Sequence, residues 1–184
     1  MMFLSLGIGT VVAVALITVV SLLTGAASQK QKQKHHEAVV FETHVIDGQL
    51  IGPLTLPSLG RGTVQLPWNL HHPSIIVLYA SWCTPCIEEL PRVAAYASTH
   101  SSSSVQYFGI DVNDVRAQGR AFARRSGVLF PSAFDTQSVA TIKFQLGGLP
   151  DTIFVNARGQ VVHEVVGVVS NAQLAAGTND LVHS

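Results

Sequence analysis

Both cysteines of the chain lie in one motif, Trp82-Cys83-Thr84-Pro85-Cys86, which joins a strand-like segment to a helix-like one. Residues 75–80 are a continuous apolar run, as expected of a buried central strand, and residues 87–98 are helix-like. The N-terminus of a helix carries partial positive charge and lowers a cysteine pKa from about 8.5 into the range of about 3.5–7.5. The motif therefore predicts that Cys83 is a nucleophile and that Cys86 resolves the mixed disulfide that Cys83 forms.

Composition narrows the class of protein. The chain has 184 residues, which suggests one globular domain with additional segments, and its formal charge is zero, so no nucleic-acid partner is expected. Two cysteines cannot build a disulfide framework or a four-thiolate zinc site. The paired histidines at 35–36 and 71–72 are sequence neighbours, which do not face one site on a helix or strand. We therefore expect no bound metal, and no cofactor other than a redox-active disulfide between Cys83 and Cys86.

The N-terminal segment is long and apolar enough to cross a bilayer. Phe3 to Leu23 spans 21 residues without a charge, which is about 30 Å of helix, whereas the apolar region of a signal peptide is usually about 7–15 residues. We expect a transmembrane anchor at residues 3–24 in contact with lipid, a polar linker at 25–40 and a folded domain at 41–184. The small residues 25–27 leave cleavage of this segment as an alternative.

The rest of the chain alternates between strand-like and helix-like segments, which predicts a partly parallel sheet covered on both faces. Asp114 is interpreted as an N-cap residue, and Asp111 as a capping residue with approach to the site of the cysteines as its alternative. The expected strands are 50–56, 63–66, 75–80 and 105–112, followed by a hairpin of 152–155 and 160–166. The expected helices are 88–98, 114–125, 136–144 and a last one from Ser170 to about Val182.

The order of motifs resembles the TlpA/ResA-like branch of the thioredoxin superfamily over roughly residues 45–180. The stretch Trp82–Pro91 is similar to its W-C-x-P-C-x-x-E-x-P signature, and Gly148–Asn156 to its G-x-P-x-T-F stretch. Residues 108–112 are similar to its next strand, and residues 52–57 with 62–64 to its added N-terminal hairpin. The resemblance implies an α/β, thioredoxin-like fold, in which helices flank a central mixed sheet, with an added N-terminal β-hairpin, preceded here by one transmembrane helix.

The resemblance also implies a set of site residues around the two cysteines. Pro150 is expected to have a cis peptide bond, to lie against the cysteine pair and to present backbone to an extended substrate. Leu149 before it is a further candidate for substrate binding. Trp82 shields the pair and contacts substrate, or else it is a core aromatic. Pro85 restricts the first helical turn.

Two positions depart from the related proteins. Thioredoxin has a buried aspartate where this chain has Val77, so Glu89, one helical turn after Cys86, is the candidate for proton transfer; the alternative is a solvated carboxylate on the helix surface. Asp151 follows Pro150 where threonine is common. A carboxylate there either lies close to Cys83 and raises its pKa, or points to solvent.

The resemblance implies a membrane-tethered thiol–disulfide oxidoreductase. We expect it to reduce disulfides of exported proteins such as apocytochrome c, and to be recharged by a membrane dithiol donor. A disulfide oxidase is the alternative enzyme, because the potentials of C-x-x-C proteins span about −270 to −120 mV. A non-enzymatic copper chaperone or docking module is a further alternative.

The side of the membrane is indicated by two opposing signals. Lys30, Lys32 and Lys34 follow the apolar segment and favour a cytoplasmic position for the domain behind it. The resemblance favours the outside, and a tethered reductase has more to reduce outside the already reducing cytoplasm. We expect a single-pass protein of the cell membrane with an extracytoplasmic domain.

Overall fold

A computed structural model describes residues 48–66, 72–100, 104–145 and 147–184. The anchor and linker expected at residues 3–24 and 25–40 lie outside the described residues. Among the described residues, none of the helices combines the length and apolar character that a bilayer span requires.

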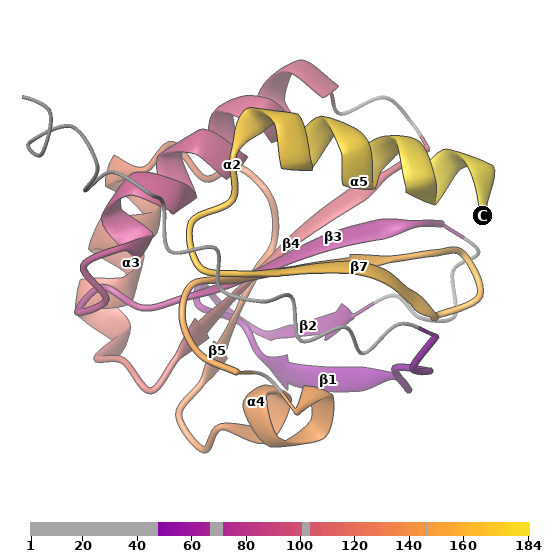
Figure 1. Ribbon diagram of the computed structural model, residues 1–184. Coiled ribbons are helices and arrows are strands. Elements are labelled where there is room, and N and C mark those ends of the chain that lie inside the picture. The colour runs from indigo at the N-terminus through magenta and orange to yellow at the C-terminus, as the bar shows by residue number, and fades with distance from the viewer. Residues whose placement is uncertain (1–47, 67–71, 101–103, 146) are drawn as a thin grey trace, which may run out of the picture. The chain divides into compact units, whose positions relative to one another are not determined.

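The domain is built on a five-stranded sheet with the order β5-β4-β3-β6-β7 (Figure 1). The strands β3, β4 and β5 are parallel to one another. Strand β6 runs antiparallel to β3, and β7 runs antiparallel to β6, so that β7 has the same direction as β3. The mixed thioredoxin-like sheet expected from the sequence is therefore present. The strands are β3 (Ser74–Tyr79), β4 (Gln106–Val112), β5 (Ser132–Asp135), β6 (Asp151–Val155) and β7 (Val161–Val166).

The central strand β3 is buried along its whole length because both of its faces are covered. Ile75, Val77 and Tyr79 pack into the core on one face, and Ile76 and Leu78 into the core on the other. A strand covered on both faces requires the unbroken apolar run that the sequence shows. The carboxyl end of β3 therefore delivers Trp82 and the cysteines to the rim of a fixed sheet.

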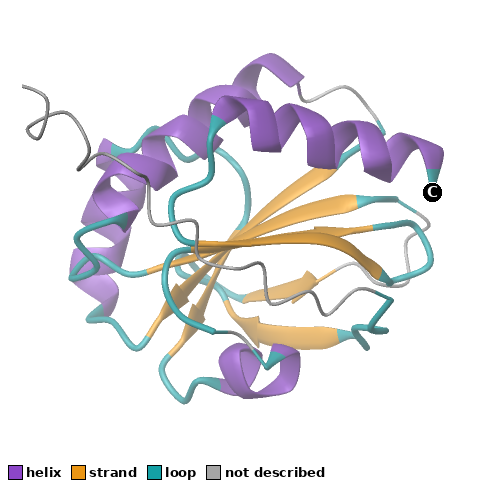
Figure 2. Ribbon diagram, viewed as in Figure 1, coloured by secondary structure: helices purple, strands orange, loops and turns teal. Residues whose placement is uncertain are grey.

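Different layers cover the two faces of the sheet, as the colours of Figure 2 make clear. Helices α2 (Cys86–His100), α3 (Arg116–Arg125) and α5 (Asn171–His183) pack on the face of Val77. A two-stranded antiparallel sheet of β1 (Leu54–Pro57) and β2 (Thr63–Leu66), together with α4 (Val139–Phe144), packs on the other face. This small sheet is the added N-terminal hairpin that the resemblance implied.

Two features hold α5 in place. Its first turn carries a reciprocal cap, in which the Ser170 hydroxyl accepts the Gln173 N–H and the Gln173 side chain accepts the Ser170 N–H. Gly177 lets the helix approach β6 closely, because a Cβ atom at this position would lie 2.5 Å from a ring carbon of Phe154. The predicted start of this helix is confirmed.

Several predicted element boundaries are wrong. Strand β1 begins at Leu54, and Leu50 makes only an isolated bridge to Gln160. Helix α4 begins at Val139 because the Asp135 carboxylate accepts the N–H groups of Val139 and Ala140, which fixes the first turn there. Strand β5 has no counterpart in the prediction, since its four residues show no alternation.

Candidate active site

The two cysteines form a disulfide at the start of α2. The sulfur–sulfur distance is 2.05 Å and the Cα atoms are 5.3 Å apart. The Cys86 N–H, the first of the helix, donates to the Cys83 sulfur at 3.3 Å. Cys83 keeps 4% of its surface exposed and Cys86 none, so Cys83 is the sulfur that another molecule can reach. The position at a helix start is the one that stabilises a thiolate at Cys83 after reduction.

Hydrogen bonds connect the segment before the disulfide to the loop that follows β4. The Asp114 carboxylate accepts the Ser81 N–H at 2.6 Å and the Ser81 hydroxyl at 2.9 Å. It also accepts the N–H of Val115, although α3 begins only at Arg116 and has no side-chain cap. The prediction that Asp114 caps α3 is therefore wrong, because this carboxylate binds Ser81 and so holds residues 81–85, which we call the redox loop.

Trp82 lies on the surface beside the disulfide, with 60% of its area exposed. Its indole N–H donates to the Asn113 carbonyl oxygen at 3.0 Å, which fixes the ring over the neighbouring groove. The alternative that Trp82 is a core aromatic is wrong. An anchored, exposed indole can contact a substrate, although that role stays a prediction.

A groove of about 410 Å³ opens next to Cys83, and we call it the disulfide groove. Pro85 and Leu149 line it, together with Ser138 and Thr141 from the start of α4. The Asn113 side-chain amide donates to the Ser138 hydroxyl at 2.6 Å and joins two loops of the wall. Sequence reasoning missed Ser138 and Thr141, because they lie in no motif.

The peptide bond between Leu149 and Pro150 is cis, which confirms the expectation from the resemblance. Leu149 is partly exposed in the disulfide groove, whereas Pro150 is buried. Pro150 leads directly into β6, and its carbonyl oxygen accepts the Gly167 N–H at 2.8 Å. The backbone at Leu149 is therefore held by the sheet at the rim where Cys83 lies.

Glu89 is a buried carboxyl group one helical turn after Cys86. Its carboxyl oxygens accept the Thr152 hydroxyl at 2.8 Å and the Val169 N–H at 2.6 Å. Burial raises the pKa of Glu89 from 4.5 to about 7, while these two hydrogen bonds and the Arg92 charge oppose the increase. The alternative of a solvated carboxylate is wrong, and the group can both hold and release a proton near neutral pH.

Asp151 is also fully buried, so the alternative in which it points to solvent is wrong. Burial raises the pKa of Asp151 well above its usual range, and the nearby Glu164 and Glu89 carboxyl groups raise it further. The raised pKa favours the protonated form of the side chain. In that form Asp151 carries no negative charge that would oppose a thiolate at Cys83.

The position of thioredoxin's buried aspartate is occupied here by Val77, which is packed in the core. A different acid, Asp111, is buried in β4, where burial and the neighbouring Asp114 raise its pKa to about 8. Asp111 packs against α3 at Gly119, where a Cβ atom would lie 1.8 Å from its carboxyl oxygen. Its carboxyl oxygens have no hydrogen-bond partner among the described residues, so the expected capping role is wrong.

No group of three or more His, Cys, Asp or Glu side chains in the described part of the chain is arranged to hold a metal ion. The site as it stands contains a reachable sulfur, a buried sulfur bonded to it and a buried carboxyl group that titrates near pH 7. Such a pair of sulfurs can exchange two electrons with a disulfide or dithiol of another molecule.

Comparisons with known proteins agree with this chemistry. The model of the AhpC/TSA family matches residues 48–164. Sporulation thiol-disulfide oxidoreductase A of Bacillus subtilis is 24% identical over 170 residues, which covers 91% of this chain and 94% of that protein. ResA of the same organism is 27% identical, and DsbE of Allochromatium vinosum is 30% identical. These last two alignments span only about half of each chain.

Solved structures show the same fold. The crystal structure of StoA from Bacillus subtilis superposes with a TM-score of 0.61 at 20% identity, over 70% of this chain and 98% of that chain. A thiol:disulfide interchange protein of the thioredoxin family from Chlorobium tepidum gives a TM-score of 0.64 at 20% identity, over 72% and 94%. The fold is thioredoxin-like, and the resemblance to ResA-like proteins is confirmed.

The family match, the relatives and the disulfide at a helix start support one conclusion about the chemistry, namely that the protein is a thiol–disulfide oxidoreductase. The matched residues 48–164 include both cysteines and the cis-proline, and they account for more than half of the chain. The chain therefore belongs to the AhpC/TSA family.

Proposed function

We propose that the protein is a membrane-tethered reductase of disulfides in exported proteins. The observation that carries the proposal is the unequal burial of the two sulfurs: Cys83 borders the disulfide groove, while Cys86 is fully buried behind it. A buried second thiol is protected from outside partners and is held next to the first one. This asymmetry suits a cycle in which Cys83 meets the substrate and Cys86 ends the reaction.

The disulfide groove has the character expected of a polypeptide-binding site. Its lining is mainly apolar, and it carries an exposed indole at Trp82 and the backbone at Leu149. An extended substrate segment would lie along this backbone with its disulfide over Cys83.

The proposed reaction transfers two electrons. The Cys83 thiolate attacks one sulfur of the substrate disulfide, a new sulfur–sulfur bond forms and the other substrate sulfur leaves and takes a proton. Cys86 then loses its proton and attacks the Cys83 sulfur. The disulfide of the structure re-forms, and the second substrate sulfur leaves as a thiol. The substrate is reduced by two electrons, and the enzyme is oxidised by two.

Glu89 is the group we propose for the proton of Cys86. It lies one helical turn along α2 and has a pKa of about 7, so it exchanges a proton at little cost near neutral pH. Its carboxyl group is oriented by Thr152 and Val169, which keeps the acid on the buried side of the helix. Asp151 in its protonated form leaves the thiolate at Cys83 unopposed.

The midpoint potential decides between reduction and oxidation in the cell. We expect the full chain, equilibrated in buffers of reduced and oxidised dithiothreitol, to have a potential of about −270 to −200 mV, close to reductases such as thioredoxin. The fraction of reduced protein is measured by alkylating the free thiols and determining the mass of the protein by mass spectrometry. A value near −120 mV, typical of a strong oxidant, would replace the reductase with a disulfide oxidase.

The tether and its orientation complete the proposal. Residues 3–24 would anchor the chain in the membrane, the domain would lie outside the cytoplasm, and a membrane dithiol protein would return the electrons. Apocytochrome c is the substrate that the family resemblance suggests. We expect a thiol reagent that cannot cross membranes to label reduced Cys83 in intact cells with a permeable outer layer. Labelling only after lysis would place the domain in the cytoplasm, as the lysines at 30, 32 and 34 favour.

A further inference from the structure

One edge of the central sheet is incomplete. Strand β5 pairs with β4 only from Gly109 onward, so residues 106–108 of β4 have a strand partner on the β3 side alone among the described residues. Pro131 explains where the pairing stops. A longer parallel ladder would need the N–H of residue 131 to donate to the Tyr107 carbonyl oxygen, and proline has no N–H.

The backbone N–H and C=O groups of Tyr107 point away from β3, toward the open edge of the sheet. The Gln106 N–H donates to the Pro73 carbonyl oxygen on the β3 side, and the Gly109 N–H donates to the Pro131 carbonyl oxygen on the β5 side. Because the N–H and C=O groups of a strand alternate between its two sides, those of Tyr107 point to the same side as those of Gly109. A donor and an acceptor are therefore presented side by side where the sheet ends.

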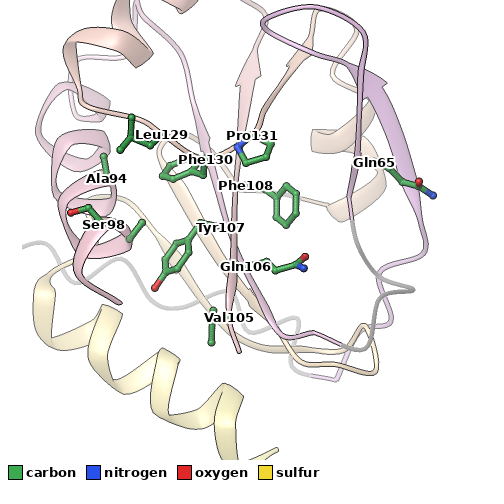
Figure 3. Close-up of a pocket in the computed structure, with 11 residues that line it drawn as sticks. Gln65, Ala94, Ser98, Val105, Gln106, Tyr107, Phe108, Leu129, Phe130 and Pro131 are labelled. Atoms are coloured by element: carbon green, nitrogen blue, oxygen red, sulfur yellow. The ribbon is translucent and has the colours of Figure 1, made fainter. Parts of the chain in front are cut away.

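A groove of about 630 Å³ surrounds this free edge, and we call it the β4 edge groove (Figure 3). Ala94 and Ser98 of α2 form one wall, Gln65 of β2 lies on the other side, and Leu129 and Phe130 lie at the end near β5. None of the residues that line the groove is charged. Its size lies within the range of about 300–1,000 Å³ found for binding pockets.

The groove lacks the charged residues that usually protect a free strand edge. Exposed edges are commonly guarded by lysine or other charges, which prevent pairing with another chain. Here Leu129 is an exposed apolar residue of the lining, with 89% of its surface open to solvent, and the carboxamide oxygen of Gln106 is buried without a partner among the described residues. These features favour pairing with another segment.

From this arrangement we infer that the β4 edge groove binds an extended, uncharged polypeptide segment, which adds to the sheet as a further strand beside Tyr107. Helical segments already satisfy their own backbone groups and could not pair with this edge. A charged side chain would lose its hydration in the groove without gaining a partner. The free edge of three residues is about 10 Å long, so a segment of about three to five residues fills it.

The β4 edge groove is separate from the disulfide groove. It lies at the Gln106 end of β4, whereas the disulfide groove touches Val112 at the other end, and six residues of strand span about 20 Å. A partner protein bound at the edge could thus leave Cys83 open. Binding at this edge needs no thiol chemistry, so the inference stands or fails independently of the proposed function.

A cysteine-free peptide tests the inference directly. The probe is a fluorescein-labelled, acetylated peptide of alternating threonine and valine, five residues long, titrated with the oxidised full chain while fluorescence anisotropy is measured. We expect saturable binding, with a shift of the Tyr107 amide resonance in the ¹⁵N spectrum. A second probe carries an N-methyl group on its valines, which removes their N–H donors and keeps the side chains. We expect it to bind about tenfold more weakly or worse.

Two variants locate the binding site. Leu129→Asp places a charge at the rim of the groove, and we expect about tenfold weaker binding. Val182→Asp is the matched control, because Val182 is an exposed apolar residue of α5 outside the groove, and it should bind as the wild type does. Melting temperatures confirm that both variants are folded. Absence of saturable binding to the wild type, equal binding by both variants, or equal binding of the N-methylated probe would each overturn the inference.

Discussion

Replacing Cys83 with serine is expected to abolish disulfide exchange, with a loss on the order of 10³-fold or more in the rate of insulin reduction. A serine hydroxyl is not ionised near neutral pH, and no hydroxyl can form the mixed disulfide on which the reaction depends. Insulin reduction by the full chain is followed as turbidity, with dithiothreitol as the electron source. The rate should fall to that of dithiothreitol alone.

Cys86→Ser is expected to give a different result. The nucleophile at Cys83 remains, but the thiol that ends the reaction is missing, so a covalent complex with the substrate accumulates. This complex is measured as a band on a non-reducing gel that disappears on reduction. Ile87→Ser is the control, because Ile87 follows Cys86 on α2, is exposed and does not line the disulfide groove. Full activity of the Cys83 variant, or complexes trapped by it through Cys86, would reverse the assigned roles.

Glu89→Gln is expected to lower the rate of disulfide exchange by about 10²-fold near pH 7, the lower end of what general acid–base catalysis contributes. Glutamine can accept the Val169 N–H and donate to the Thr152 hydroxyl, so the variant keeps the contacts and loses only the titrating proton. The pH dependence of the rate near pH 7, which we assign to Glu89, should be absent in the variant. The measurement is the rate between pH 5 and 9.

Glu88→Gln is the matched control for that experiment. Glu88 is exposed on the same helix and pairs with Arg92 at 2.7 Å, so its loss should leave the pH profile unchanged. If the profiles of Glu89→Gln and the wild type coincide, Glu89 takes no part in proton transfer. If both variants lowered the exchange rate equally, the cause would be the loss of a negative charge on α2 and not the loss of the proton that Glu89 transfers.

The same group predicts how stability depends on pH. The pKa of Glu89 is about 7 in the folded protein and 4.5 in an ordinary environment, so between these values the folded state binds more protons than the unfolded state. The free energy of unfolding therefore decreases as pH rises from about 4.5 to 7, by at most about 3 kcal/mol from this group. Urea denaturation at pH 5 and 8 should show this difference in the wild type and a smaller one in Glu89→Gln.

Much of the fold could be predicted because the decisive patterns are local. The short apolar run at 75–80 favours a strand covered on both faces, and the turn residues at 156–159 predict the hairpin of β6 and β7. Strand β5 could not be predicted in this way. It is held by pairing with β4, and its residues become a strand only in that environment.

The site could be predicted only as far as its motifs extend. Cys83, Cys86 and Pro150 belong to motifs, whereas Ser138 and Thr141 reach the disulfide groove through the course of the chain between β5 and β6. Asp114 was expected to cap a helix, because aspartate is preferred at that position, but its carboxylate binds Ser81 instead. Burial raises the pKa values of Glu89 and Asp151, and the burial of these two side chains could not be predicted from the sequence.

The redox loop is fastened at Ser81 and Trp82, ahead of the cysteines, while Thr84 and Pro85 between them are exposed. Both residues also line the disulfide groove, so mutations in this dipeptide are expected to change the affinity of the disulfide for electrons and the surface that meets the substrate at the same time. Electron affinity and substrate choice are thus coupled traits in this scaffold. A variant that is shifted at these two residues toward making or breaking disulfides is therefore expected to accept a different set of substrates.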